Sequence, residues 1–270
     1  MAHQAPLRRD GRRSAATLMS VPPPSAPAHL LRTHTAAVNA LHISDDNERL
    51  YSADASGSVV ITSTRSFRPL AQWQAHTDSI LGVQEWEHQI ITETDTQLGE
   101  SATTAGTATP TLKYSMDVNA LNYCRFSLLP LPITTEPTAL IALPNLIESS
   151  LADVWELPSQ KRLHAAIGKT DSPLRSDGRG DRDAMGIIMS MHLFQHPHPH
   201  ASGQTQLRLL CCYENGGVTL WAYTNQNKPT SIEGIGWERL WTTKAHNETG
   251  QRFFDTLTIA SHADFLKLWR

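Results

Sequence analysis

The chain alternates short apolar runs with polar turn sequences, and this pattern predicts β-strands rather than helices. In the first clear unit, four strands are predicted, over Val38–Ile43, Leu50–Ala53, Val59–Thr62 and a stretch near Leu70–Gln74. Turn residues separate them, for example Ser44–Asn47 between the first two. Four short strands in about 40 residues are typical of one blade of a β-propeller.

The beginning of this unit recurs along the chain. The segment His34–Leu41 matches His76–Val83 in the spacing of its His, Thr and apolar residues, and the two histidines stand 42 residues apart. This separation lies within the ~40–45 residue period of a four-stranded blade. Val118–Leu121 repeats Val38–Leu41 letter for letter and is predicted to begin a third unit. Ala245-His246 is a further Ala-His pair of the same kind.

The second half of the unit recurs as well. Asn215–Trp221 is a Gly-containing turn followed by an alternating strand that ends in Trp221. The same register ends in Trp155 and in Trp269, while Thr62 occupies the Trp position of the first unit. Alternation of this kind buries one face of each strand against a neighbouring blade.

The motifs resemble the WD40 repeat family, whose units begin with a Gly-His pair, contain a turn Asp and close with Trp-Asp. The pairs are degenerate here, for example Ala75-His76 at the start and Trp155-Glu156 at the end. The resemblance implies that His34, His76 and His246 are structural residues. Each would form hydrogen bonds across its blade to the turn and to a Ser or Thr. The predicted fold is therefore an all-β, WD40-type propeller.

The predicted domain organisation is a disordered tail over residues 1–28 and a propeller over 29–270. Loop insertions interrupt the propeller near 93–112, 170–185 and 195–206. Seven blades do not fit in this length, and four units plus a shortened fifth can be traced. We therefore expect an incomplete or truncated ring. It could still close if Ala28–Arg32 paired beside Phe265–Trp269; otherwise its exposed strand edges would favour aggregation.

Composition narrows the functional classes. The chain has 23 Lys and Arg against 26 Asp and Glu, and this near balance argues against a nucleic-acid-binding protein. The apolar stretch Leu128–Ile147 contains four prolines and is not a membrane-spanning helix. The tail contains Arg8, Arg9, Arg12 and Arg13, which leaves a mitochondrial transit peptide or a nuclear-import patch open.

Candidate chemistry is weak throughout the sequence. His196, His198 and His200 alternate with prolines, which separates the imidazoles instead of converging them on a metal. Gly168-Lys169-Thr170 lacks the first Gly of a phosphate-binding loop. The three cysteines cannot form a disulfide framework, and Cys211 and Cys212 sit in an apolar strand. We predict no catalytic, cofactor-binding or metal-binding residue, and hence no enzyme.

A closer resemblance is to the ASTRA-associated protein 1 family of fungi. It is carried by Pro22–Pro24, Ala28–Arg32, the Val38–Leu41 motif, Asp153–Pro158 and Asn215–Val218. The resemblance implies a non-catalytic nuclear scaffold subunit, with cytoplasm as the alternative location. Its implied partners are Tel–Tti co-chaperone proteins, RuvB-like ATPases and a large kinase-like scaffold protein, in an assembly linked to chromatin remodelling.

Two other functions stay open at this level. One is a different WD40 adaptor, such as a guanine-nucleotide-binding β-subunit-like protein. The other is a propeller hydrolase or metal enzyme, which would need carboxylates or histidines converging on the central channel. For the scaffold reading, we expect the loops near His34, His76 and Asn215 to form the docking face, because loops on a rigid framework carry most binding sites.

Overall fold

The computed structural model describes residues 26–87, 89–94, 110–132, 135–169, 185–197, 203–225 and 227–245. The chain divides into two units, Met1–Arg32 and Thr33–Arg270. Residues 26–32, the described part of the first unit, contain no strand. The Phe265–Trp269 segment suggested as a pairing partner for Ala28–Arg32 lies outside the described residues.

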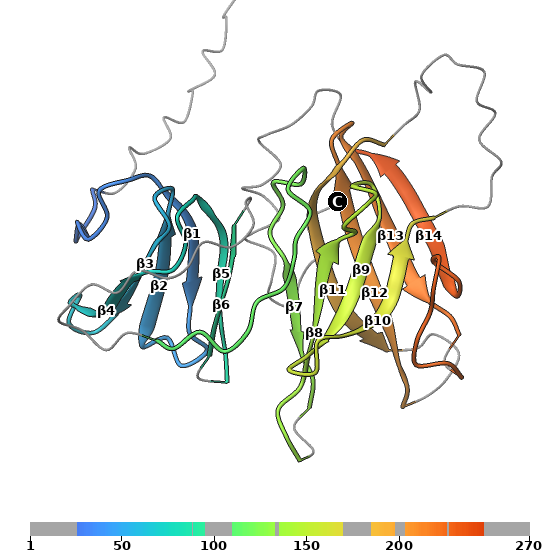
Figure 1. The fold of residues 1–270 in the computed structure, drawn as a ribbon, viewed down its shortest axis with the longest axis horizontal. Coiled ribbons are helices and arrows are strands. Elements are labelled where there is room, and N and C mark those ends of the chain that lie inside the picture. The colour runs from blue at the N-terminus through green and yellow to red at the C-terminus, as the bar shows by residue number, and fades with distance from the viewer. Residues whose placement is uncertain are drawn as a thin grey trace, which may run out of the picture. The chain divides into compact units, whose positions relative to one another are not determined.

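All regular structure among the described residues is β-strand (Figure 1). The strands are β1 (Val38–Ile43), β2 (Arg49–Asp54), β3 (Ser58–Ser63), β4 (Pro69–Gln74), β5 (Ile80–Trp86), β6 (Gln89–Thr94), β7 (Ser127–Pro130), β8 (Ala139–Pro144), β9 (Ala152–Leu157), β10 (Lys161–Ile167), β11 (Ile188–Pro197), β12 (Thr205–Tyr213), β13 (Gly217–Tyr223) and β14 (Trp237–Lys244).

The strands form antiparallel sheets in which each strand pairs with its neighbour in the sequence. The first blade is β1–β4, the third blade is β7–β10 and the fourth blade is β11–β14. Between them, the second unit is the two-stranded sheet β5–β6. Sheets with this sequential order, joined one after another, are the blades of a propeller. The all-β propeller fold expected from the sequence is confirmed.

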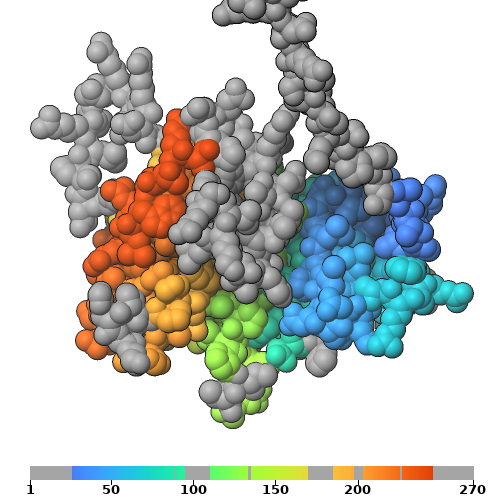
Figure 2. Space-filling view, turned by 180° about the vertical axis from the view of Figure 1, so that it is seen from behind, coloured from blue at the N-terminus to red at the C-terminus, as the bar shows by residue number. Residues whose placement is uncertain are grey.

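Apolar clusters join each sheet to the next. Tyr51 and Trp73 of the first blade pack with Ile80 of β5, and Trp86 of β5 packs with Phe126 and the third blade. A larger cluster joins the third blade to the fourth. In the space-filling view from behind, the green third blade lies between the orange fourth blade and the blue-to-cyan first blade and second unit (Figure 2). Burial of both faces explains why all seven residues of β13 are buried.

The four strands predicted for the first blade are confirmed. β1 has the predicted bounds, and β2, β3 and β4 each extend at most one residue beyond the predicted ends. The strand predicted after the Asn215 turn is β13. The described part of the second unit consists of β5 and β6, and residues 95–109, which follow β6, lie outside the described ranges.

The third unit does not begin where the repeat predicted. Val118–Leu121 is not a strand, although the identical Val38–Leu41 lies in β1. The physical reason is a local turn: Asn119 Oδ1 accepts a hydrogen bond from the N–H of Leu121 at 2.9 Å, and Asn119 Nδ2 donates to the carbonyl of Asn145 at 2.7 Å. Asparagine side chains that bind backbone groups in this way favour turns over strands.

The predicted loop insertion at 195–206 is also shorter than expected. Gln195, His196 and Pro197 belong to β11, and they pair with Leu207, Gln206 and Thr205 of β12. Polar side chains do not prevent this pairing, because the backbone of the hairpin still forms its ladder while alternate side chains face solvent. His198 and His200 lie outside the described residues, as do most of the insertions predicted near 93–112 and 170–185.

Candidate docking surface at the loop face of the blades

The turn β2–β3, the connection β4–β5 and the turns β8–β9 and β12–β13 all emerge at the same end of the strands, because successive strands are antiparallel. We call this end the loop face. It contains the segments near His34, His76 and Asn215 that the sequence predicted as docking loops. The chemistry of the loop face therefore depends on which side chains are held inside the blades and which reach the surface.

His34 is held inside the first blade by two hydrogen bonds. Its Nδ1 lies 2.7 Å from Asp54 Oδ2 and its Nε2 lies 2.8 Å from Ser52 Oγ. The other oxygen of Asp54 accepts hydrogen bonds from the Ser56 N–H, the Ser56 hydroxyl and the Ser58 N–H, at 2.9, 2.7 and 3.1 Å. The carboxylate thus links the histidine to the β2–β3 turn.

The electrostatics of Asp54 follow from these contacts. Burial raises the pKa of its carboxyl group, but hydrogen bonds from Ser56, His34 and the Ser58 N–H outweigh burial and leave the pKa below its usual value. Asp54 is only 1% exposed. Its two oxygens accept four hydrogen bonds in all, so the buried carboxylate is well satisfied. Both ring nitrogens of His34 and both carboxylate oxygens of Asp54 are thus used in contacts within the first blade.

His76 is the counterpart of His34 in the second unit. Its Nε2 lies 2.8 Å from Thr92 Oγ1 on β6, and burial lowers the pKa of its imidazole. Thr94 stands in the position of Asp54, and its hydroxyl donates to the carbonyl of Ser79 at 2.9 Å. His76 is therefore also hydrogen-bonded to a strand of its own unit. Among the described residues, its ring forms no hydrogen bond with a carboxylate.

The predicted tryptophan positions lie at the same register in two sheets but have different surroundings. Trp221 of β13 is 3% exposed and belongs to the core between the third and fourth blades. Trp155 of β9 is half-buried, and the guanidinium of Arg162 lies 5.5 Å from its ring centre. The remaining predicted repeat positions, His246 and Trp269, lie outside the described residues.

The sequence did not reveal that Asn145, in the β8–β9 turn, is held by the buried carboxylate of Asp153 in β9. Asn145 Nδ2 donates to Asp153 Oδ1 at 2.9 Å, and the Ala166 N–H donates to the same oxygen at 2.8 Å. Asn145 Oδ1 accepts the N–H groups of Ile147 and Glu148, each at 3.0 Å. An Asx residue directly after a strand was the available signal, because such side chains commonly bind the backbone of the following turn.

Acidic and apolar side chains are among those that reach the loop face. Asp78 in the β4–β5 connection, Glu148 in the β8–β9 turn and Glu214 in the β12–β13 turn are exposed. In the same β8–β9 turn Leu146 is 43% exposed and Ile147 is 94% exposed. Apolar side chains held out from a rigid turn beside carboxylates suit contact with a protein surface that carries basic residues.

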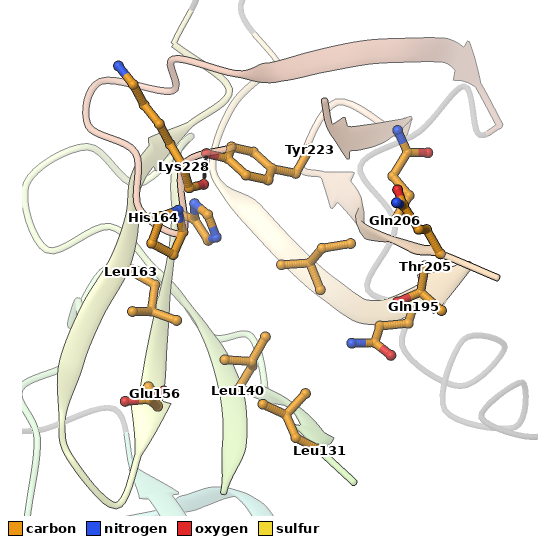
Figure 3. A pocket seen from close by; sticks show the side chains of 13 residues that line it. Leu131, Leu140, Glu156, Leu163, His164, Gln195, Thr205, Gln206, Tyr223 and Lys228 are labelled. Carbon is orange, nitrogen blue, oxygen red and sulfur yellow. Dashed lines mark hydrogen bonds between the residues drawn. The ribbon is translucent and has the colours of Figure 1, made fainter. Parts of the chain in front are cut away.

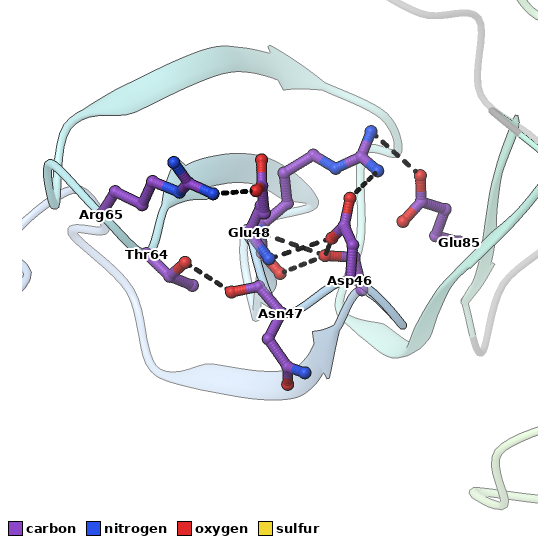
Figure 4. Close-up of polar contacts among 8 residues, drawn as sticks. Asp46, Asn47, Glu48, Thr64, Arg65 and Glu85 are labelled. Carbon is purple, nitrogen blue, oxygen red and sulfur yellow. Dashed lines mark hydrogen bonds and ion pairs between the residues drawn. The ribbon is translucent and has the colours of Figure 1, made fainter.

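The opposite end of the first blade is braced by ion pairs to the second unit (Figure 4). Arg49 lies between two carboxylates, with Nη2 3.1 Å from Asp46 Oδ2 and Nη1 3.2 Å from Glu85 Oε1 of β5. Nearby, Arg65 pairs with Glu48, and the Thr64 hydroxyl donates to the carbonyl of Asn47 at 2.6 Å. These contacts fix the strand connections opposite the loop face.

The three cysteines of the chain are buried. The thiols of Cys124, Cys211 and Cys212 are free, and burial raises the pKa of each, that of Cys212 to about 12. Within the ranges that the structure describes, no group of three or more His, Cys, Asp or Glu side chains is arranged to hold a metal ion. In those same ranges, no helix is long and apolar enough to cross a membrane.

These features define a WD40-type β-propeller, in which a histidine before the blade binds the strand and turn within it. No protein-family model matches the sequence. The chain is similar to ASTRA-associated protein 1 of Pyricularia oryzae, with 31% identity over 85% of this chain and 49% of the relative. It is also similar to the proteins of that name from Verticillium alfalfae, at 31% identity over 76% and 51%, and Penicillium rubens, at 27% over 85% and 58%.

The family resemblance read from the sequence is thus confirmed, and it covers more of the chain than the quoted motifs. The chain spans about half the length of the Pyricularia and Verticillium relatives and 58% of the Penicillium one. Among solved structures, the β-propeller domain of Cps50 (Swd1) from Myceliophteria thermophila is similar with a TM-score of 0.46 and 13% identity, over 78% of this chain and 60% of that one.

Proposed function

We propose that this chain is a non-catalytic WD-repeat scaffold subunit of an ASTRA-like assembly in the nucleus. The observation that carries the proposal is the similarity to ASTRA-associated protein 1 over most of the chain. The partners proposed on that basis are Tel–Tti co-chaperone proteins, RuvB-like ATPases and a large kinase-like scaffold protein. Through them the chain would take part in chromatin remodelling and in the assembly of kinase-like proteins, without binding nucleic acid or membranes directly.

The local chemistry supports a docking role over catalysis. His34 and His76 are used in hydrogen bonds inside their own units, and Asp54 is fully engaged. By contrast, Ile147, Glu148 and Glu214 are exposed to solvent on the loop face. Rigid sheets that present loops in fixed positions can bind a partner without a large ordering cost.

The first test is affinity purification of the tagged full chain from its native host, followed by mass spectrometry. We expect recovery of the Tel–Tti and RuvB-like subunits. Recovery of general chaperones alone would contradict the proposal. Metal analysis of the purified chain is the companion measurement, because a stoichiometric metal would favour the propeller-enzyme alternative.

The second test locates the docking surface. The triple variant Asp78→Lys, Glu148→Lys and Glu214→Lys reverses charge on the loop face, and we expect it to lose the co-purified subunits. The control is Glu87→Lys with Glu136→Lys, two exposed glutamates in turns at the opposite end, compared with the double variant Glu148→Lys and Glu214→Lys so that the charge change is equal. Unchanged recovery with the triple variant, or equal loss with the control, would show that the loop face is not the docking surface.

A further inference from the structure

A hollow of about 450 Å³ lies between the third and fourth blades, at the end opposite the loop face (Figure 3). β9 and β13 end beside it, and β8 and β12 begin there. Leucine side chains from both blades line it, including Leu140, Leu163 and Leu207, while exposed Gln195 and Thr205 stand at its rim. A mixed apolar and polar hollow of this size falls in the range of ligand sites.

His164 of β10 is the polar group at the buried side of this hollow. It is 3% exposed, and its ring packs 4.5 Å from the ring of Tyr223 and 5.3 Å from that of Trp237, measured between centres. Its Nδ1 lies 3.0 Å from Ser231 Oγ. Its Nε2 has no hydrogen-bond partner among the residues that the structure describes. Because His164 lines the hollow, this nitrogen is available to a polar group that enters it.

The hollow is held in shape by backbone hydrogen bonds between the two blades. The Ser231 N–H donates to the Leu163 carbonyl at 2.8 Å, and the Ala165 N–H donates to the Ser231 carbonyl at 3.0 Å. The Tyr223 hydroxyl donates to the Lys228 carbonyl at 2.7 Å, which fixes the segment after β13 (Figure 3). A site with its walls already fixed loses little conformational entropy when it is filled.

The chemistry of His164 selects among possible occupants. Burial lowers the pKa of its imidazole to about 4, so the ring is neutral between pH 5 and 8. Depending on the tautomer at Nδ1, a neutral imidazole offers either an acceptor or an N–H donor at Nε2. A phenol hydroxyl both donates and accepts, so it matches either tautomer, whereas an indole only donates. A phenol also carries this group at the tip of an apolar ring, which suits leucine walls.

We propose that the hollow receives a tyrosine side chain from an extended segment of a partner protein. The ring lies between the leucine side chains, and the hydroxyl hydrogen-bonds with His164 Nε2. The exposed amide of Gln195 at the rim binds the backbone of the inserted segment. This inference rests on the proposed docking function, but it adds a second binding site at the opposite end of the blades.

The direct test measures binding of p-cresol, the tyrosine side-chain analogue, and of toluene, which lacks the hydroxyl. NMR of the full chain, labelled at its histidine rings, follows the His164 signals during each titration. We expect p-cresol to bind roughly 3–10-fold more tightly than toluene, which is the effect of one net hydrogen bond. Equal affinities would overturn the assignment of His164 as the recognition group.

Two variants locate the binding. Thr205→Trp places an indole at the rim without changing the buried wall, and we expect it to abolish p-cresol binding. The matched control is Thr77→Trp, an exposed threonine at the loop face, which is expected to leave p-cresol binding unchanged. In His164→Phe the affinity for p-cresol should fall to that for toluene. If this variant does not fold, Thr205→Trp decides: unchanged p-cresol binding there overturns the proposal.

The source of the phenol is tested with the blocked peptides Ala-Ala-Tyr-Ala-Ala and Ala-Ala-Phe-Ala-Ala. We expect the tyrosine peptide to bind more tightly than p-cresol, because the Gln195 amide contacts its backbone, and more tightly than the phenylalanine peptide, which lacks the hydroxyl. Binding of p-cresol without binding of the tyrosine peptide would overturn the partner-tyrosine assignment. These titrations use no ASTRA subunit, so a failed co-purification with intact p-cresol binding counts against the proposed function alone.

Discussion

The first blade and the second unit each bury a carboxylate next to the histidine-binding residue, and the two carboxylates behave in opposite ways. In the first blade the sequence is Ser52-Ala53-Asp54, and in the second unit it is Thr92-Glu93-Thr94. Ser52 and Thr92 both bind a histidine at 2.8 Å. The carboxylate lies two residues after the hydroxyl residue in one case and one residue after it in the other.

This one-residue difference moves the carboxylate to the other face of its strand, because strand side chains alternate. Asp54 faces His34 and the turn, and its pKa is lowered by several hydrogen bonds despite burial. Glu93 faces the third blade, where the Phe126 N–H donates to Oε2 at 2.6 Å. Burial raises the pKa of Glu93 to about 8, although that hydrogen bond and the charge of Arg125 oppose the shift.

The comparison shows that a buried carboxylate can serve two purposes in neighbouring units. Asp54 holds one blade together internally and stays ionised at neutral pH. Glu93 connects the second unit to the third blade and is largely protonated at neutral pH. Each role predicts a different response to mutation and to pH.

The largest expected effect is that of Asp54→Ala. It leaves His34, the Ser56 hydroxyl and two backbone N–H groups without their acceptor. We expect a loss of about 3–5 kcal/mol in the free energy of unfolding, measured by urea denaturation. Asp46→Ala, which removes a half-exposed carboxylate, is the control and should cost clearly less, because solvent screens this group. Equal losses would mean that the Asp54 network does not stabilise the blade.

Glu93→Gln should change how stability depends on pH. The folded pKa of Glu93 lies above its unfolded value, so its contribution to stability is full below about pH 4 and is lost as pH rises towards 8. Glutamine has no charge to bury and can still accept from the Phe126 N–H. At pH 9 we expect the variant to exceed the native chain by at least about 1.4 kcal/mol, the equivalent of one pKa unit. Urea denaturation at pH 5 and pH 9 measures this, and parallel pH profiles would rule out ionisation of Glu93 as the cause.

The two histidines provide a smaller contrast. His34→Phe breaks two hydrogen bonds, including one to a buried carboxylate, and should cost about 2 kcal/mol or more. His76→Phe breaks the single bond to Thr92 and should cost about 1 kcal/mol. Thermal unfolding of both variants compares them directly. A larger loss for His76→Phe would contradict the difference drawn between the two units.

The smallest effect is a shift in one pKa. Thr94→Asp places a carboxylate in the second unit at the position that Asp54 occupies in the first. The nearby negative charge should stabilise protonated His76 and raise its pKa from the value that burial has lowered. Histidine NMR titration measures the change. An unchanged His76 pKa would show that residue 94 does not face the histidine as residue 54 does.

By itself, the sequence determined the strands of the first blade to within one residue, the strand after Asn215 and the WD40 class. These features depend on local properties, namely alternation of apolar residues, turn chemistry and a fixed repeat period. His34 and His76 could be singled out for the same reason, because their position before the first strand of each unit is visible in the sequence.

Only the tertiary structure decided the features that depend on contacts between sheets. Val118–Leu121 is a turn despite its identity with a strand segment, because the Asn119 side chain binds both Leu121 and the distant Asn145. The opposite states of Asp54 and Glu93 depend on what each strand face packs against. The hollow at His164 exists because Ser231 of the fourth blade pairs with the edge of the third. Such contacts join residues far apart in the chain, so no short pattern in the sequence encodes them.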